Sequence, residues 1–144
     1  MQKFIEKFKV NELLLARVGA WNISLRPAQV TLGSLILSLD RECPNLSGLT
    51  SKEGEELSSA FVVIEKVLSE TFKPEKINYL ALMMVDNQVH FHVIPRYSSV
   101  RDFEGVGYED VNWPKPPNVL SKIDLSDENL LKLFQYLKNM IKES

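Results

Sequence analysis

The chain has only two histidines, His90 and His92, and both lie in the segment QVHFHVI. Side chains alternate between the two faces of a β-strand, so a strand here places both imidazoles and Gln88 on one face. The apolar residues between them occupy the other face, which we expect to pack in the core. An imidazole with an ordinary pKa near ~6.5 is mostly neutral at pH 7 and can attack phosphorus as a nucleophile.

Three interpretations of the histidine pair follow from the pattern alone. The simplest is that both are surface residues on the solvated face of a sheet. A zinc site is the second, but it needs at least one more protein ligand, and the chain has no third histidine and only one cysteine. The third is nucleophilic catalysis, in which one imidazole attacks and the other assists.

The N-terminal half of the chain predicts the sheet that must hold this segment. Two short strands are expected within residues 12–27, around a turn at Gly19, with Trp21 and Ile23 in the core. Residues 33–40 predict a third strand that is buried on both faces.

Two helices are expected to pack against this sheet. Thr50 and Glu53 match a capping box, and apolar residues recur at helical spacing from there to Phe72. Ser126 caps a last helix, whose apolar stripe consists of Leu130, Phe134, Leu137 and Ile141. The segment 96–119 between the histidines and this last helix is rich in Gly and Pro, and we expect an ordered loop without regular structure there.

The strand before the histidines is expected over residues 77–85, joined to 88–94 by a two-residue turn at Asp86 and Asn87. This tight turn would place Met83 opposite His90 and Ala81 opposite His92. Small or soft neighbours would leave room above the imidazoles.

Length and composition set the broad class. The 144 residues predict one domain, 1–144, and the formal net charge of -2 gives no reason to expect nucleic acid or a membrane surface as a partner. Cys43 is the single cysteine, which excludes an internal disulfide, and the N-terminus does not resemble a secretory signal. No apolar run approaches the ~18 residues of a transmembrane helix. We expect a cytoplasmic protein.

Three segments together resemble the histidine triad (HIT) family. QVHFHVIPR is similar to the family signature His-φ-His-φ-His-φ-φ followed by Pro-Arg, where φ is apolar. GSLILSLDRECPNLSGL resembles the strand and loop ahead of the family's long helix. PRYSSVRDF resembles the corresponding segment of the fragile histidine triad branch, which contains dinucleoside polyphosphate hydrolases. The likeness runs in order from Trp21 to Phe103.

The resemblance implies an α+β domain with a HIT-like antiparallel sheet of about five strands, one main helix and a C-terminal helix, assembled as a homodimer. It implies a nucleotide hydrolase or nucleotidyl transferase that acts at the α-phosphate of a nucleoside phosphate conjugate, such as a dinucleoside polyphosphate. His90 would form the nucleotidyl-histidine intermediate, and His92 would assist the leaving group. The scheme needs no metal and no cofactor.

Two departures from the family pattern bear on activity. Gln88 stands where the first histidine of the signature belongs, and Ser34 follows Gly33 where the family commonly has another histidine. We expect these two side chains to lie close together behind His90 and to hydrogen-bond to each other. If they do not support His90, the alternative is a catalytically impaired nucleotide-binding or regulatory protein; a zinc-binding module is a third possibility.

Three further residues are candidates for substrate binding. Asn87 could replace part of a phosphate-contacting segment that this chain lacks. Arg26 lies near a ribose-contacting position of the fragile branch, and Arg96 follows Pro95 in the signature, where either a phosphate contact or a surface ion pair is expected.

Overall fold

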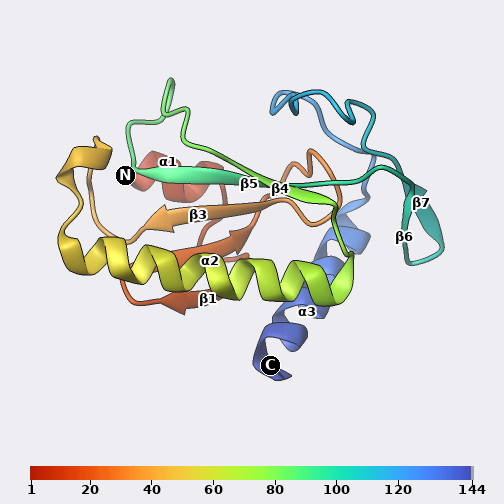
Figure 1. Cartoon of the computed structure of the whole chain (residues 1–144), viewed down its shortest axis with the longest axis horizontal. Helices are drawn as coiled ribbons and strands as arrows, with labels where there is room; N and C mark the ends of the chain where they lie inside the picture. The colour runs from red at the N-terminus through yellow and green to blue at the C-terminus, as the bar shows by residue number, and fades with distance from the viewer. Residues whose placement is uncertain (144) are drawn as a thin grey trace.

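A five-stranded antiparallel sheet forms the centre of the structure, a computed structural model that describes residues 1–143. Its order is β1-β2-β3-β5-β4, so the strand with the histidines lies between β3 and the edge strand β4 (Figure 1). The strands are β1 (Leu14–Val18), β2 (Trp21–Leu25), β3 (Leu35–Leu39), β4 (Lys76–Leu80) and β5 (His90–Arg96). The predicted α+β class and five-stranded sheet are confirmed.

One face of the sheet forms the main core with two long helices. Trp21 and Ile23 of β2 are completely buried there, as predicted, together with Val93 of β5. Helix α2 (Ser51–Thr71) lies along this face, and α3 (Asp127–Glu143) packs beside it (Figure 1). No helix within residues 1–143 is long and apolar enough to cross a membrane.

Both long helices begin where the sequence predicts. The Thr50 hydroxyl accepts from the Glu53 amide at 3.1 Å, and the Glu53 carboxylate accepts from the Thr50 amide at 2.9 Å. This reciprocal pair satisfies two backbone donors at the start of α2. The Ser126 hydroxyl accepts from the Asn129 amide at 3.1 Å at the start of α3. A short 3-10 turn, η1 (Leu46–Gly48), precedes α2.

The other face of the sheet is covered by a helix that the sequence analysis did not anticipate. Helix α1 (Gln2–Lys7) lies over β3 and β5 (Figure 1). Phe4, Phe8 and Val10 pack against Ile36 of β3 and form a small buried cluster that is separate from the main core. The face that carries the histidines is therefore covered. The interpretation of both histidines as surface residues, which requires a solvated face, is wrong.

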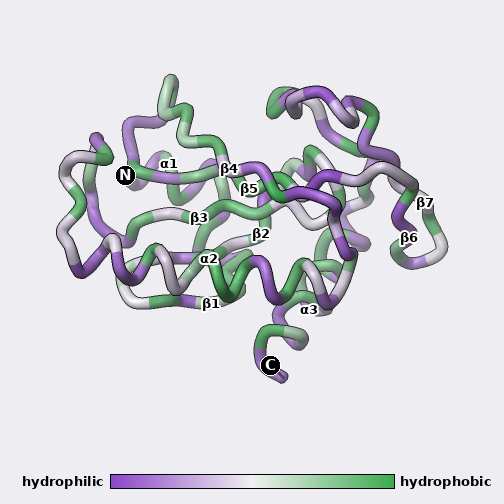
Figure 2. Tube along the Cα trace, viewed as in Figure 1, coloured by the Kyte–Doolittle hydropathy of each residue, from purple (hydrophilic) through white to green (hydrophobic). Residues whose placement is uncertain are grey.

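The connection between β4 and β5 is longer than predicted. Strand β4 ends at Leu80, and residues 81–89 form an open loop instead of a two-residue turn at Asp86 and Asn87. Met83 adopts a φ of 46°, which is incompatible with an extended strand. Leu80 pairs with His92, so the predicted register, with Ala81 opposite His92, is wrong by one residue. Figure 2 shows hydrophobic residues at the projecting tip of this loop.

The segment after β5 contains one small regular element. A short hairpin forms from β6 (Arg101–Phe103) and β7 (Val106–Tyr108), where only irregular loop was expected. Its turn residues Glu104 and Gly105 both have positive φ, at 51° and 76°, as the tightest hairpin turns require. The chain then returns across the molecule and brings Val119 next to Arg26.

Candidate functional site

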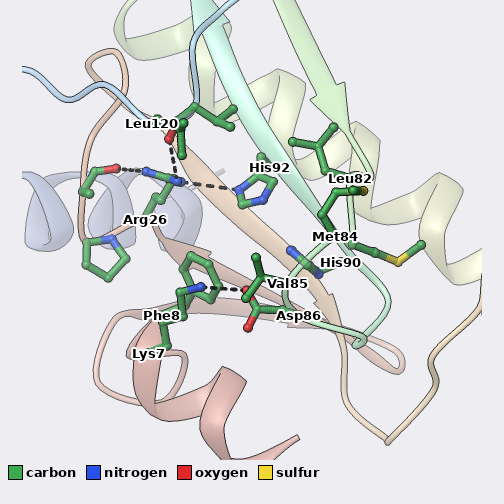
Figure 3. A pocket seen from close by; sticks show the side chains of 14 residues that line it. Lys7, Phe8, Arg26, Leu82, Met84, Val85, Asp86, His90, His92 and Leu120 are labelled. Atoms are coloured by element: carbon green, nitrogen blue, oxygen red, sulfur yellow. Dashed lines mark hydrogen bonds and ion pairs between the residues drawn. The ribbon is translucent and has the colours of Figure 1, made fainter.

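A cavity of about 530 Å³ opens above the histidines on the face that α1 partly covers. Its polar lining consists of His90, His92 and Arg26 together with the paired Lys7 and Asp86 (Figure 3). Apolar side chains of the 81–89 loop and of residues 119–120, with Phe8, Pro27 and Ala28, line the rest. Several of these are strongly exposed, Met84 at 85% and Leu120 at 93%, and together they form an apolar mouth.

His90 is held as a neutral imidazole with a free ring nitrogen. Its side chain is buried, at 2% exposure, and its Nδ1 lies 2.6 Å from the backbone carbonyl of Gln88. A carbonyl can only accept, so Nδ1 carries the proton and Nε2 keeps its lone pair. Burial lowers the pKa of His90, more than the carbonyl contact raises it. His90 thus presents an unprotonated nitrogen at pH 7.

His92 is held in the opposite tautomer. The Nε–H group of Arg26 donates to Nδ1 of His92 at 3.4 Å, so the proton of the neutral ring lies on Nε2. Burial lowers the pKa of His92 to about 4; the charge of Arg26, and a proton on His90 whenever one is present, act in the same direction. The two rings stand edge to face with centroids 4.9 Å apart. The site therefore presents one lone pair and one N–H group side by side.

Arg26 brings an unneutralised positive charge to the cavity wall. Its guanidinium donates to the backbone carbonyls of Ala28 and, at 3.1 Å, of Val119. Within residues 1–143, no carboxylate forms a salt bridge with it. Burial lowers the pKa of Arg26 from its usual value, but an arginine remains charged at pH 7. A buried cation without a counter-ion is suited to an anionic ligand.

Helix α1 closes one side of the cavity. The Phe4 ring lies 4.8 Å from the His90 ring, and the Phe8 ring lies 5.9 Å from the His92 ring, measured between centroids. Lys7 donates to Asp86 of the 81–89 loop at 2.8 Å, which ties the helix to the opposite wall (Figure 3). These contacts explain why both imidazoles are buried.

The expected contact between Gln88 and Ser34 is wrong. The Gln88 amide binds at the far end of β3, accepting from the Cys43 amide and donating to the carbonyls of Leu39 and Arg41. Ser34 precedes β3, and its hydroxyl donates to the Thr31 carbonyl at 2.7 Å. In the observed register Ser38, not Ser34, lies opposite His90.

Two other predicted binding residues lie outside the cavity. Asn87 is exposed and lines a separate depression beside Met1 and Glu42. Arg96 forms a buried ion pair with Asp110, with 2.7 Å between Nε and Oδ2, and also donates to Asn78. Its guanidinium fastens the return loop to the sheet and does not reach the histidines.

The residues that the sequence analysis missed are those of α1 and of the cavity mouth. The spacing of Phe4 and Phe8, one helical turn apart, was the available signal for a helix with an apolar face. The apolar run at residues 81–85 predicts a continuing strand, but the structure places it in the loop at the mouth of the cavity, where Leu82, Met84 and Val85 are exposed. Within residues 1–143, no group of three or more His, Cys, Asp and Glu residues could hold a metal ion.

The structure resembles several solved proteins. A histidine triad (HIT) protein from Sinorhizobium meliloti superposes with a TM-score of 0.74 and 22% identity, over 99% of this chain and 94% of that one. A histidine triad protein from Bradyrhizobium japonicum gives a TM-score of 0.73 and 17% identity, over 98% and 96%. A hypothetical histidine triad nucleotide-binding protein from Sulfolobus tokodaii gives 0.67 and 15%, over 91% and 84%.

Comparisons of sequence alone give no further relatives: no protein-family model and no curated protein matches the chain. The likeness therefore lies in the arrangement of the sheet and helices, and it extends over nearly the whole length of the two proteins from S. meliloti and B. japonicum. The chain has the fold of the histidine triad proteins.

Proposed function

We propose that the protein hydrolyses a nucleoside phosphate conjugate, or transfers its nucleotidyl group, through an intermediate on His90. The observation that carries this proposal is the complementary protonation of the two imidazoles, a lone pair on His90 and an N–H group on His92, beside the buried Arg26. The fold it shares with histidine triad proteins, one of them described as nucleotide-binding, supports the same chemistry.

The reaction has two balanced steps. Nε2 of His90 attacks the α-phosphorus, a P–N bond forms, and the P–O bond to the leaving group breaks. The Nε2–H group of His92 hydrogen-bonds to the departing oxygen and stabilises its negative charge. Water then attacks the same phosphorus, the P–N bond breaks, and a proton is released as the free nucleotide forms. Arg26 adds positive charge near the phosphate, which phosphoryl transfer requires.

A second candidate function is nucleotide binding without turnover. It is favoured by the contact between Phe4 and His90, which leaves the imidazole only 2% exposed. An in-line attack needs the reacting atoms about 3–3.5 Å apart, and α1 must leave room for the phosphate. A homodimer in the cytoplasm, expected from the sequence, remains part of the proposal.

The test is a hydrolysis screen with untagged protein over adenosine and guanosine conjugates, including dinucleoside polyphosphates, aminoacyl adenylates and adenosine phosphosulfate. We expect turnover of at least one conjugate and a mass increase of one nucleotidyl group on the peptide that contains His90. His90→Gln should lose turnover and the adduct but retain nucleotide binding, because the cavity remains.

The matched control is Asn87→Ala, which changes an exposed neighbour outside the cavity and should behave as the wild type. If the wild type hydrolyses no conjugate and forms no adduct, the catalytic proposal is wrong. Micromolar nucleotide affinity in that case would support the binding protein instead.

A further inference from the structure

We infer that Arg26 is a positioning residue that fixes His92 in the Nε2–H tautomer, so that the site keeps a permanent neutral hydrogen-bond donor beside the lone pair of His90. The inference deepens the proposed function and rests on it for its catalytic meaning. The tautomer itself, however, is a property of the resting protein.

The hydrogen bond between Arg26 and His92 can run in one direction only. Arginine has five N–H donors and no acceptor, so its Nε can only donate to Nδ1 of His92. The distance is 3.4 Å, and both side chains are buried. An imidazole nitrogen that accepts a hydrogen bond carries no proton. The proton of neutral His92 must therefore lie on Nε2, the nitrogen that Arg26 does not contact.

The guanidinium of Arg26 is itself held in place by one nearby and one distant part of the chain. It donates to the carbonyl of Ala28, two residues away, and to that of Val119, 93 residues away. The backbone at Arg26 is fixed as well: its amide donates to the Ser34 carbonyl at 3.0 Å, and its carbonyl accepts from the Gln29 amide side chain at 2.7 Å. With both terminal nitrogens of the guanidinium bonded to carbonyls, the Nε–H group of Arg26 stays directed at His92.

The backbone carbonyls orient Arg26 without neutralising its charge. A carboxylate partner would hold the guanidinium equally well but would cancel its charge. Four ionisable groups influence His92: His90, Arg26, Asp86 and Lys7. Only Asp86 favours the imidazolium form, and its carboxylate is bonded to Lys7 at 2.8 Å. The surroundings therefore disfavour a second proton on His92 at neutral pH.

A His92 held in this way keeps its hydrogen-bond donor over a wide pH range. If His92 could take a second proton near neutral pH, or place its proton on Nδ1, the cavity would alternate between two hydrogen-bonding patterns. With His92 buried and Arg26 in place, His92 donates from Nε2 whether the solution is at about pH 6 or pH 8.

The test exploits the presence of only two histidines in the chain. Untagged protein labelled with ¹⁵N in the imidazoles gives ring signals from His90 and His92 alone, which His90→Gln assigns. In the wild type we expect His92 to show a protonated Nε2 and an unprotonated Nδ1, with no titration between about pH 8 and pH 5.

Arg26→Met should give a mixture of His92 tautomers and a higher titration midpoint than the wild type, but the midpoint should stay below about 6.5, because burial, the largest cause of the lowered pKa, remains. The matched control is Arg17→Met, which removes an exposed guanidinium paired with Asp40 and should leave both histidines unchanged. Where a conjugate is turned over, Arg26→Met should lower kcat about tenfold to a hundredfold with a smaller change in KM, and should add an acidic limb to the pH profile.

Two results would overturn the inference: a protonated Nδ1 on His92 in the wild type, or an unchanged His92 spectrum and titration in folded Arg26→Met. If that variant does not fold, the wild-type spectrum decides alone. Because the spectrum needs no turnover, a protein that hydrolyses nothing in the conjugate screen but shows the expected tautomer would contradict the proposed function and leave the role of Arg26 intact.

Discussion

Replacing Gln88 tests whether this residue is structural. Its amide makes three hydrogen bonds to the backbone: it accepts from the Cys43 amide at 3.1 Å and donates to the carbonyls of Leu39 at 2.9 Å and Arg41 at 2.6 Å. Gln88→Ala leaves all three backbone groups without this partner. Two of the three bonds are fully buried, and an unsatisfied buried group costs about 1–3 kcal/mol. We expect the free energy of unfolding to decrease by about 2–4 kcal/mol.

The substitution Gln88→His would complete the family signature and still destabilise the protein. A neutral imidazole has one donor and one acceptor, so it can serve at most two of the three backbone groups. We expect a loss of about 1–2 kcal/mol for the unserved group. His90 should be unaffected, because its partner is the backbone carbonyl of residue 88, which any side chain leaves in place.

The assay is urea denaturation followed by circular dichroism. With a slope of about 2 kcal/mol/M, the expected midpoint decreases are about 1–2 M for Gln88→Ala and about 0.5–1 M for Gln88→His. Asn87→Ala, at the exposed neighbouring position, should stay within about 0.5 kcal/mol of the wild type. A Gln88→Ala protein as stable as that control would refute the structural role. So would a Gln88→His protein more stable than the wild type.

Two further predictions concern stability. Asp110→Ala should cost about 3–5 kcal/mol in urea denaturation, because it leaves Arg96 buried and unpaired, whereas the exposed Glu109→Ala should cost little; equal effects would contradict this. Burial lowers the pKa of His92 to about 4 in the folded protein, below the ordinary value of about 6.5 in the unfolded chain. As the pH falls, the unfolded chain therefore takes up this proton first, and the free energy of unfolding decreases between about pH 6.5 and about pH 4. His92→Gln should therefore lose less stability than the wild type on going from about pH 7.5 to pH 5, as measured by its urea midpoint.

The sheet and the long helices could be predicted because their signals are local. The capping box at Thr50 and Glu53, the turn at Gly19 and the buried residues Trp21 and Ile23 each follow from a few adjacent residues, and the structure confirms them. The alternation around His90 likewise placed both imidazoles on one face of β5.

The cavity could not be predicted in the same way, because distant segments build its walls. The partner of His92 comes from residue 26, and Val119, 93 residues further along, fixes that partner. Ser34 was misplaced because the family motif suggests proximity, whereas the strand register decides it. Because the helix of 6 residues that covers this face was not predicted, the burial of the imidazoles was not predicted either.

The packing of helix α1 bears on how the cavity could open without unfolding of the sheet. Its contacts close long loops in the chain, since Lys7 and Asp86 are 79 residues apart, and closing such loops costs conformational entropy. The helix is anchored by a small cluster with Phe4, Phe8, Val10 and Ile36 that shares no buried residue with the main core. Releasing α1 therefore exposes little of the apolar surface that maintains the sheet. We therefore expect the helix to be a unit of low local stability that detaches and exposes both imidazoles while the rest of the molecule stays folded.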